Sequence, residues 1–126
     1  MALKAVIIDD DKIIRKTLEK YLTDLDFSVS TADQGSSGLE LVEMIRPDLV
    51  ISDMLMPGTH GIEICNIIKQ SEELSGIKVI LMSSLYKRSD TMQEELDCEY
   101  DGFLEKPFDF NQLVSMLHQI NLSGFK

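Results

Sequence analysis

Short apolar runs alternate with segments of helical periodicity along the whole chain, and this alternation limits the possible folds more than any other feature. Three of the runs are continuously apolar, as expected for strands that helices cover on both faces. Such a succession predicts an α/β protein in which right-handed crossovers place helices on both faces of a parallel sheet. We expect strands at five runs, the second of them weak: Ala5–Ile8, Val29–Ala32, Leu49–Ile51, Val79–Met82 and Phe103–Leu104.

The segments between and after these runs carry the apolar spacing of helices. Clear stripes predict helices around residues 13–25, 39–45, 64–68 and 110–120. The second should end near Arg46, because Pro47 disfavours helical backbone in the residue before it. The segment Ser89–Leu96 is acidic and polar, and we expect it to form the least firmly packed helix.

Length and charge narrow the class of protein. The 126 residues suit a single domain over 1–126, in which 121–126 form a short tail. No run approaches the ~18 apolar residues of a membrane span, and there is no room for a signal peptide before the first strand. The formal net charge of −10 argues against nucleic acid as a direct ligand and favours cations or basic protein surfaces. We expect a cytoplasmic protein.

The cysteines and histidines suggest structural roles. Cys65 and Cys98 are far apart in the sequence and form no CxxC pair, so they are interpreted as reduced thiols at packing positions in a reducing compartment. His60 and His118 have no partner at ligand spacing and are expected at the surface.

Charged and polar residues follow four of the expected strands. Ligands of parallel α/β sheets bind at the carboxyl ends of the strands, so these side chains should lie together. Three adjacent carboxylates repel one another, and a cation or a phosphorylated group among them would relieve that repulsion. One of the three, Asp11, is better explained as the N-cap of the first helix. The residues concerned are Asp9, Asp10, Asp11, Asp53, Ser83 and Lys106.

Four motifs, in their order and spacing, resemble those of bacterial two-component response-regulator receiver domains, including the chemotaxis receivers. They are Ile7–Asp11, Asp48–Gly58, Ile80–Ser84 and Asp101–Phe108. The resemblance covers the whole chain. It implies a flavodoxin-like, doubly wound (βα)5 fold with the strand order 2-1-3-4-5.

The resemblance also implies a phosphoacceptor role for Asp53 in a two-component system or phosphorelay. A phosphohistidine on a histidine kinase or a histidine phosphotransfer protein would be the donor. Mg²⁺ would bind directly to Asp10 and Asp53, with Asp9 holding a coordinated water and the backbone carbonyl of Leu55 as a further ligand.

The remaining site residues would act on the phosphoryl group and its output. Lys106 would neutralise phosphoryl oxygens, and Ser83 would hydrogen-bond one of them. Phosphorylation would then switch a surface formed by segment 89–96, the strand at Phe103–Leu104 and the last helix, for partner binding or homodimerisation. Ser83 and Phe103 are the expected switch residues, although a core-edge aromatic explains Phe103 equally well. The protein would be a signalling phosphoacceptor and not an enzyme, catalysing only its own phosphorylation and dephosphorylation.

Two alternatives stay open. A phosphatase of the aspartyl-phosphate type also uses a strand-end aspartate with Mg²⁺, but it usually needs a second acid two residues later, where this chain has Leu55. A degenerate receiver would bind a partner without being phosphorylated. Its usual mark is the loss of an acid or of the lysine, and this chain has kept all of them.

Overall fold

The structure is a computed structural model that describes residues 2–56, 59–84 and 98–125. The expected helix Ser89–Leu96 lies outside the described residues. All five expected strands are confirmed, as are the four helices with clear stripes. In chain order the elements are β1 (Lys4–Ile8), α1 (Lys12–Asp24), β2 (Ser28–Ala32), α2 (Gly35–Ile45), β3 (Leu49–Asp53), α3 (Gly61–Gln70), β4 (Lys78–Ser84), β5 (Gly102–Lys106) and α5 (Phe110–Gln119).

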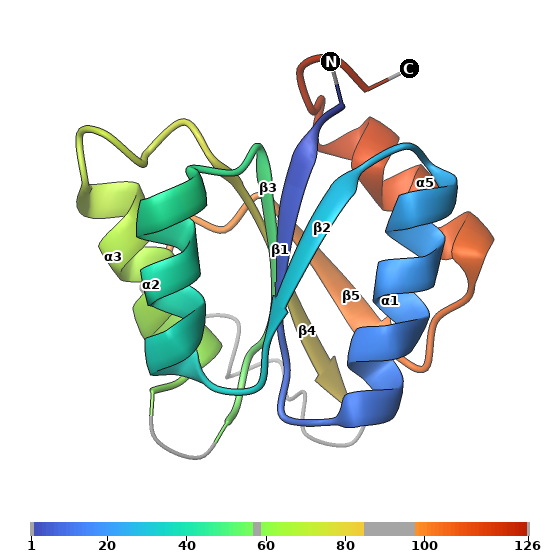
Figure 1. Ribbon diagram of the computed structural model, residues 1–126, viewed down its shortest axis with the longest axis horizontal. Helices are drawn as coiled ribbons and strands as arrows, with labels where there is room; N and C mark the ends of the chain where they lie inside the picture. The colour runs from blue at the N-terminus through green and yellow to red at the C-terminus, as the bar shows by residue number, and fades with distance from the viewer. Residues whose placement is uncertain (1, 57–58, 85–97, 126) are drawn as a thin grey trace.

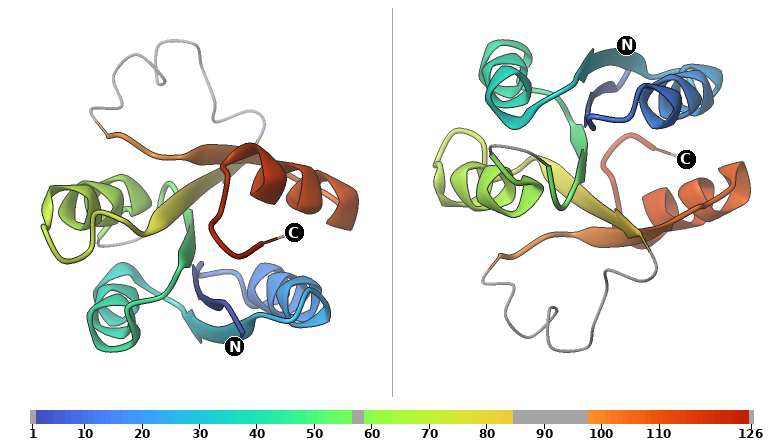
Figure 2. Two further views of the ribbon diagram at one scale, coloured as in Figure 1. Left: turned by 90° about the horizontal axis from the view of Figure 1, so that it is seen from above. Right: turned by 90° about the horizontal axis from the view of Figure 1, so that it is seen from below.

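The five strands form one parallel sheet in the order β2-β1-β3-β4-β5, which confirms the predicted doubly wound topology. Helices α2 and α3 cover one face of the sheet, and α1 and α5 cover the other (Figure 1). The two end-on views show the same three layers (Figure 2). In Figure 1 the carboxyl ends of the strands point downward, and this edge carries the candidate site.

Each face of the sheet has its own apolar core, which explains why the strands are continuously apolar. Along β1, Ala5 and Ile7 belong to the core beneath α1 and α5. Val6 and Ile8, which alternate with them, belong to the core beneath α2 and α3. All four side chains are buried, so this stretch has no solvent-exposed position at which a polar residue would be expected.

The helix ends follow the local sequence. Asp11 caps α1 by accepting hydrogen bonds from the backbone N–H groups of Ile13 and Ile14, as predicted. Helix α2 ends at Arg46, directly before Pro47, in a left-handed conformation with φ of 50°. Ile13 departs from the expected apolar stripe, because its side chain is 76% exposed at the start of α1.

The interpretation of Cys65 and Cys98 as separate reduced thiols is wrong, because the two form a disulfide. Their α-carbons lie 6.5 Å apart, within the range that a disulfide spans, although 33 positions separate them in the sequence. The packing part of the interpretation holds for Cys65, which is fully buried in α3. Cys98 and Tyr100, just before β5, pack against the core beneath α2 and α3, and this position brings Cys98 to α3.

Among the described residues, no helix is both long enough and apolar enough to cross a membrane.

Candidate functional site

The sheet register brings the predicted site residues to one edge. Asp9 follows Ile8, which pairs with Ser52. Asp53 pairs with Met82 of β4, and Ser83 follows Met82. Ser84, the last residue of β4, pairs with Lys106 at the end of β5. Residues more than 90 positions apart in the chain therefore meet at the carboxyl ends of neighbouring strands, as the strand-end rule predicts.

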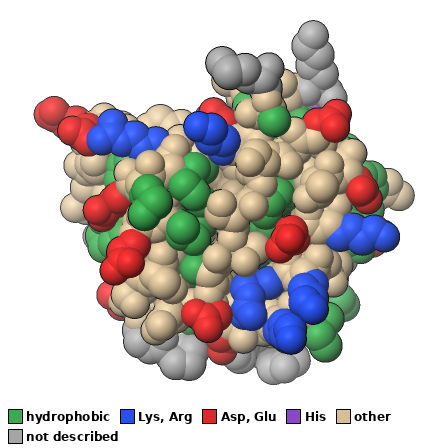
Figure 3. All heavy atoms as spheres, in the orientation of Figure 1, with side chains coloured by type: hydrophobic (Ala, Val, Ile, Leu, Met, Phe, Trp, Pro, Cys, Tyr) green, Lys and Arg blue, Asp and Glu red, His purple; other side chains and the backbone are tan. Residues whose placement is uncertain are grey.

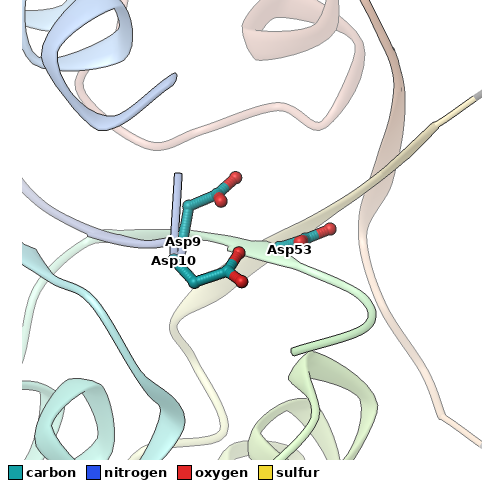
Figure 4. Close-up of side chains that lie close together, drawn as sticks. All are labelled: Asp9, Asp10 and Asp53. Carbon is teal, nitrogen blue, oxygen red and sulfur yellow. The ribbon is translucent and has the colours of Figure 1, made fainter. Parts of the chain in front are cut away.

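Three carboxylates of this edge lie close enough to share one cation. Asp9, Asp10 and Asp53 each offer an oxygen, and these oxygens lie within 4.8 Å of one another. Figure 4 shows the three side chains directed toward a common space from β1's end and from β3. Asp9 is fully buried, Asp53 is half-buried and Asp10 is exposed, so the cluster opens to solvent on the side of Asp10.

The buried carboxylate of Asp9 is fixed by two charge-assisted contacts. One oxygen accepts a hydrogen bond from the backbone N–H of Asp11 at 2.8 Å, and the other accepts from Lys106 Nζ at 2.7 Å. Its backbone carbonyl accepts a third hydrogen bond, from Arg15 Nη1 at 2.7 Å. Because a buried charge is tolerated only when it is paired and hydrogen-bonded, these contacts explain how Asp9 stays in the interior.

Lys106 bridges Asp9 and the predicted phosphoacceptor. Its ammonium lies 2.7 Å from Asp9 Oδ2 and 3.5 Å from Asp53 Oδ1, and the lysine side chain is only 15% exposed. Three carboxylates and one ammonium leave two negative charges in excess. That excess and the all-oxygen donor set fit a hard divalent cation such as Mg²⁺.

The surroundings of Asp53 disfavour its charged form. Burial raises the pKa of the Asp53 carboxyl above its ordinary value of 3.8, and the neighbouring charges of Asp9 and Asp10 raise this pKa further. Lys106 opposes them through its charge and its hydrogen bond, without reversing the direction. A carboxylate held among like charges in this way is common at functional sites.

The other predicted residues have more local contacts. Ser83 is buried, and its hydroxyl donates a 3.3 Å hydrogen bond to the carbonyl of Ser84. Leu55 lies two residues beyond Asp53, and its carbonyl stays a predicted ligand. Phe103 lies on β5, partly buried against the core beneath α2 and α3, with its ring centroid 6.2 Å from that of Tyr100.

Two residues that the sequence did not assign to the site, Gly61 and His60, help to position Asp53. The α-carbon of Gly61 packs so closely against the carbonyl of Asp53 that a Cβ at this position would collide with it. The Nδ1 atom of His60 accepts a hydrogen bond from the backbone N–H of Met56 at 3.2 Å, which ties the chain after β3 to the start of α3. A glycine at the first position of a helix was the available signal for the close approach.

Fold and site together define a doubly wound, flavodoxin-like α/β protein with an acid–lysine cluster at the carboxyl edge of its sheet. The family model of the response regulator receiver domain matches residues 5–118. This chain therefore belongs to that family and is a receiver domain of two-component signalling.

Relatives and solved structures agree with this assignment. The probable transcriptional regulator ycf29 of Pyropia yezoensis is 32% identical over 121 residues, which cover 95% of this chain and 54% of the relative. The response regulator MprA of Mycolicibacterium vanbaalenii is 27% identical over 95% of this chain and 51% of its own length. The chain thus spans about half the length of the curated relatives it matches.

Among solved structures, the signal receiver domain of a signal transduction histidine kinase from Syntrophus aciditrophicus has a TM-score of 0.85 and 29% identity. The match covers 99% of this chain and 93% of that one. The chemotaxis response regulator CheY4 of Vibrio cholerae also has a TM-score of 0.85, over 95% of this chain and 99% of that one. Its 23% identity supports the fold alone.

Proposed function

We propose that Asp53 accepts a phosphoryl group from a phosphohistidine on a histidine kinase or a histidine phosphotransfer protein. The observation that carries the proposal is the position of Lys106, whose ammonium lies 3.5 Å from Asp53 Oδ1 and 2.7 Å from Asp9 Oδ2. A lysine held beside the acceptor can offset the repulsion between a carboxylate and an incoming phosphoryl group. The protein would act as a signalling phosphoacceptor in the cytoplasm and catalyse only its own phosphorylation and dephosphorylation.

Asp10 and Asp53 would hold Mg²⁺, with the carbonyl of Leu55 as a further ligand and Asp9 acting through a water. Two observations suit this assignment. Asp53 is half-buried and Asp10 is exposed, and one oxygen of each lies within 4.8 Å of the other and of an Asp9 oxygen. When bound, the ion would supply positive charge against the phosphoryl oxygens.

The chain's own residues would carry the transfer. An oxygen of Asp53 attacks phosphorus, the P–N bond to the donor imidazole breaks, and its electron pair stays on that nitrogen. The product is an acyl phosphate on Asp53. Lys106 exchanges part of its contact with Asp9 for a phosphoryl oxygen, and Ser83 exchanges its 3.3 Å bond to Ser84 for another.

The start of α1 is suited to receive the phosphohistidine donor. Ile13 is exposed there and lies two residues after Asp11, beside the acid cluster. Lys and Arg side chains gather over the same end of α1 at the lower right of Figure 3, where Lys12, Arg15 and Lys16 belong to the first turns of the helix. In a chain of net charge −10, an exposed apolar side chain with three basic residues in the same turns of α1 fits an acidic rim on a protein partner.

The output would be a change of the surface that includes β5, α5 and the segment before β5. Phe103 and Met116 line a hollow of about 530 Å³ between β5 and α5, which a partner or a second copy could cover. Ser83 and Phe103 would link Asp53 to this surface. Relatives of about twice this length are named as transcriptional regulators, but the charge of −10 favours a protein over nucleic acid as the direct partner of this domain.

Labelling with acetyl phosphate and Mg²⁺, followed by intact-mass measurement, tests the proposal. We expect one phosphoryl group on the wild type, none on Asp53→Asn, and unchanged labelling on Glu72→Gln, which alters an exposed acid at the opposite edge. A labelled Asp53→Asn variant would refute the assignment. A wild type that is neither labelled nor shifted in melting temperature by beryllofluoride with Mg²⁺ would favour the degenerate receiver, and steady release of phosphate from added phosphomonoesters would favour the phosphatase.

A further inference from the structure

The disulfide joins two parts of the chain that the receiver chemistry does not use. Cys65 lies in the middle of α3 and is fully buried, whereas Cys98 lies just before β5 and is partly exposed. Both pack in or against the core beneath α2 and α3. They are also the only two cysteines of the chain, so each has a single possible intramolecular partner.

A second, non-covalent attachment lies one helical turn further along α3. Lys69 Nζ contacts Asp101 Oδ2 at 2.7 Å, with side chains 14% and 21% exposed. Asp101 also accepts a hydrogen bond from the backbone N–H of Val79 at 2.8 Å, and its own N–H donates to the carbonyl of Val79 at 2.8 Å. The stretch Cys98–Asp101 is therefore held to α3 and β4 at both ends, by a covalent bond at one and by charge and backbone contacts at the other.

We propose that Cys65 and Cys98 form a reversible thiol–disulfide site whose oxidation state sets how tightly the stretch Cys98–Asp101 is held. Cys98 is the reactive end, because its sulfur belongs to the partly exposed partner of the pair. An external thiolate of the glutathione type attacks Cys98 Sγ, which forms a mixed disulfide and releases Cys65 as a thiolate that takes up a proton.

A second thiolate then attacks the external sulfur of the mixed disulfide and frees Cys98, which is protonated in turn. The net change consumes two low-molecular-weight thiols and yields one low-molecular-weight disulfide and two protein thiols. The reverse sequence, with glutathione disulfide as the oxidant, restores the bond. In a compartment rich in reduced glutathione the pair would stay open until the oxidant accumulates.

The consequence of opening is confined by the second attachment. Reduction frees Cys98 but leaves Asp101 bound to Lys69 and Val79, so the change falls on Cys98–Tyr100. Tyr100 is the residue whose ring lies 6.2 Å from that of Phe103 on β5. The change on reduction would therefore fall next to Phe103, which lines the hollow of the proposed output surface. This inference concerns the thiol pair itself and does not rest on phosphorylation of Asp53.

Equilibration of the full chain with glutathione buffers of graded ratio, followed by alkylation and intact-mass measurement, tests the site. We expect the two thiols to appear and disappear together, with no singly alkylated monomer at equilibrium, across ratios that native protein can reach. Three results would overturn the inference: thiols that stay free in excess glutathione disulfide, a bond that excess dithiothreitol cannot open without denaturant, or oxidation that yields a dimer between chains.

A local readout separates a switch from a mere structural bond. On reduction, amide hydrogen exchange should accelerate more in a peptide covering residues 98–104 than in peptides from α1 and α5, which should change only as far as the global stability falls. The melting temperature should fall by about 10 °C, on the order expected for a disulfide closing a loop of this length. Cys98→Ser, which leaves the buried Cys65 in place, should show the reduced-state exchange in both buffers. Equal exchange in oxidised and reduced wild type would refute the proposed effect on Cys98–Tyr100.

Discussion

Replacing the acceptor aspartate with its amide should stabilise the protein when no divalent cation is present. The pKa of Asp53 is raised in the folded state, chiefly by burial, so the native state binds a proton more tightly than the unfolded chain does. The stabilising contribution of a carboxyl group shifted in this direction is fully present when the pH is below the ordinary pKa of 3.8. It is lost as the pH rises through the pKa of the folded state. At neutral pH the ionised side chain therefore costs stability, and Asp53→Asn removes that cost.

The expected gain can be worked from the distances. At 4.8 Å, the upper limit of the separations between these oxygens, repulsion from Asp9 or Asp10 is about 0.9 kcal/mol at the dielectric of water and about 3.5 kcal/mol at an effective dielectric of 20. Attraction to Lys106 at 3.5 Å is about 1.2 to 4.7 kcal/mol over the same range. Two repulsions less one attraction leave a net gain of about 0.5 to 2 kcal/mol, which raises the melting temperature by roughly 2 to 10 °C for a domain of this size.

Thermal unfolding in EDTA between pH 4 and 8 measures this difference. The gap between Asp53→Asn and wild type should be widest near neutral pH and shrink toward acid. Added Mg²⁺ should narrow or reverse the gap, because the ion stabilises the wild type more than the variant. Glu72→Gln, an exposed acid at the far edge, should shift stability by no more than about 0.5 kcal/mol at any pH. An Asp53→Asn variant less stable than wild type in EDTA at pH 7, or equally stabilised by Mg²⁺, would contradict the reasoning.

Three further substitutions test the surroundings of the acceptor. Lys106→Met should lower the free energy of unfolding by about 3 kcal/mol in urea titrations, because it leaves the buried carboxylate of Asp9 without its cation; a loss below 1 kcal/mol would mean that the pair is not formed. Gly61→Ala should cost about 1 to 3 kcal/mol and weaken beryllofluoride binding, since the new Cβ meets the carbonyl of Asp53; unchanged binding and stability would show that the contact relaxes freely. Ile13→Ser should slow transfer from a phosphohistidine protein roughly tenfold while labelling by acetyl phosphate stays constant; an equal loss with both donors would point to a disturbed site and not to lost docking.

The fold was predictable because burial on both faces leaves a simple trace in the sequence. Strands such as Val79–Met82 are apolar at every position, and the helices between them repeat their apolar residues three and four apart. The positions of Asp9, Asp53 and Lys106 followed from one rule about strand ends. The prediction of a cap at Asp11 needed only the geometry of a helix start.

Contacts that depend on three-dimensional packing were not predictable in the same way. The disulfide joins residues 33 positions apart, and neither cysteine has a local sequence signal. The sequence grouped Ile13 with the apolar stripe of α1, but the residue is exposed because it lies about two and a half turns before the buried Leu22 and therefore faces the opposite side of the helix. The pairing of Lys106 with Asp9 could not be inferred either, since three neighbouring carboxylates compete for the same ammonium.

The pairing of Lys106 with Asp9 indicates different roles for the three acids, which their positions in the sequence do not distinguish. Both oxygens of Asp9 are already engaged, one by the N–H of Asp11 and the other by Lys106, and the residue is fully buried. Asp10 is exposed, and the pKa of Asp53 is raised by its surroundings, so these two carboxylates have the most to gain from a cation. Asp9 is then best placed to act through a water and to hold Lys106 beside Asp53. Its substitution should disturb the lysine at least as much as the metal.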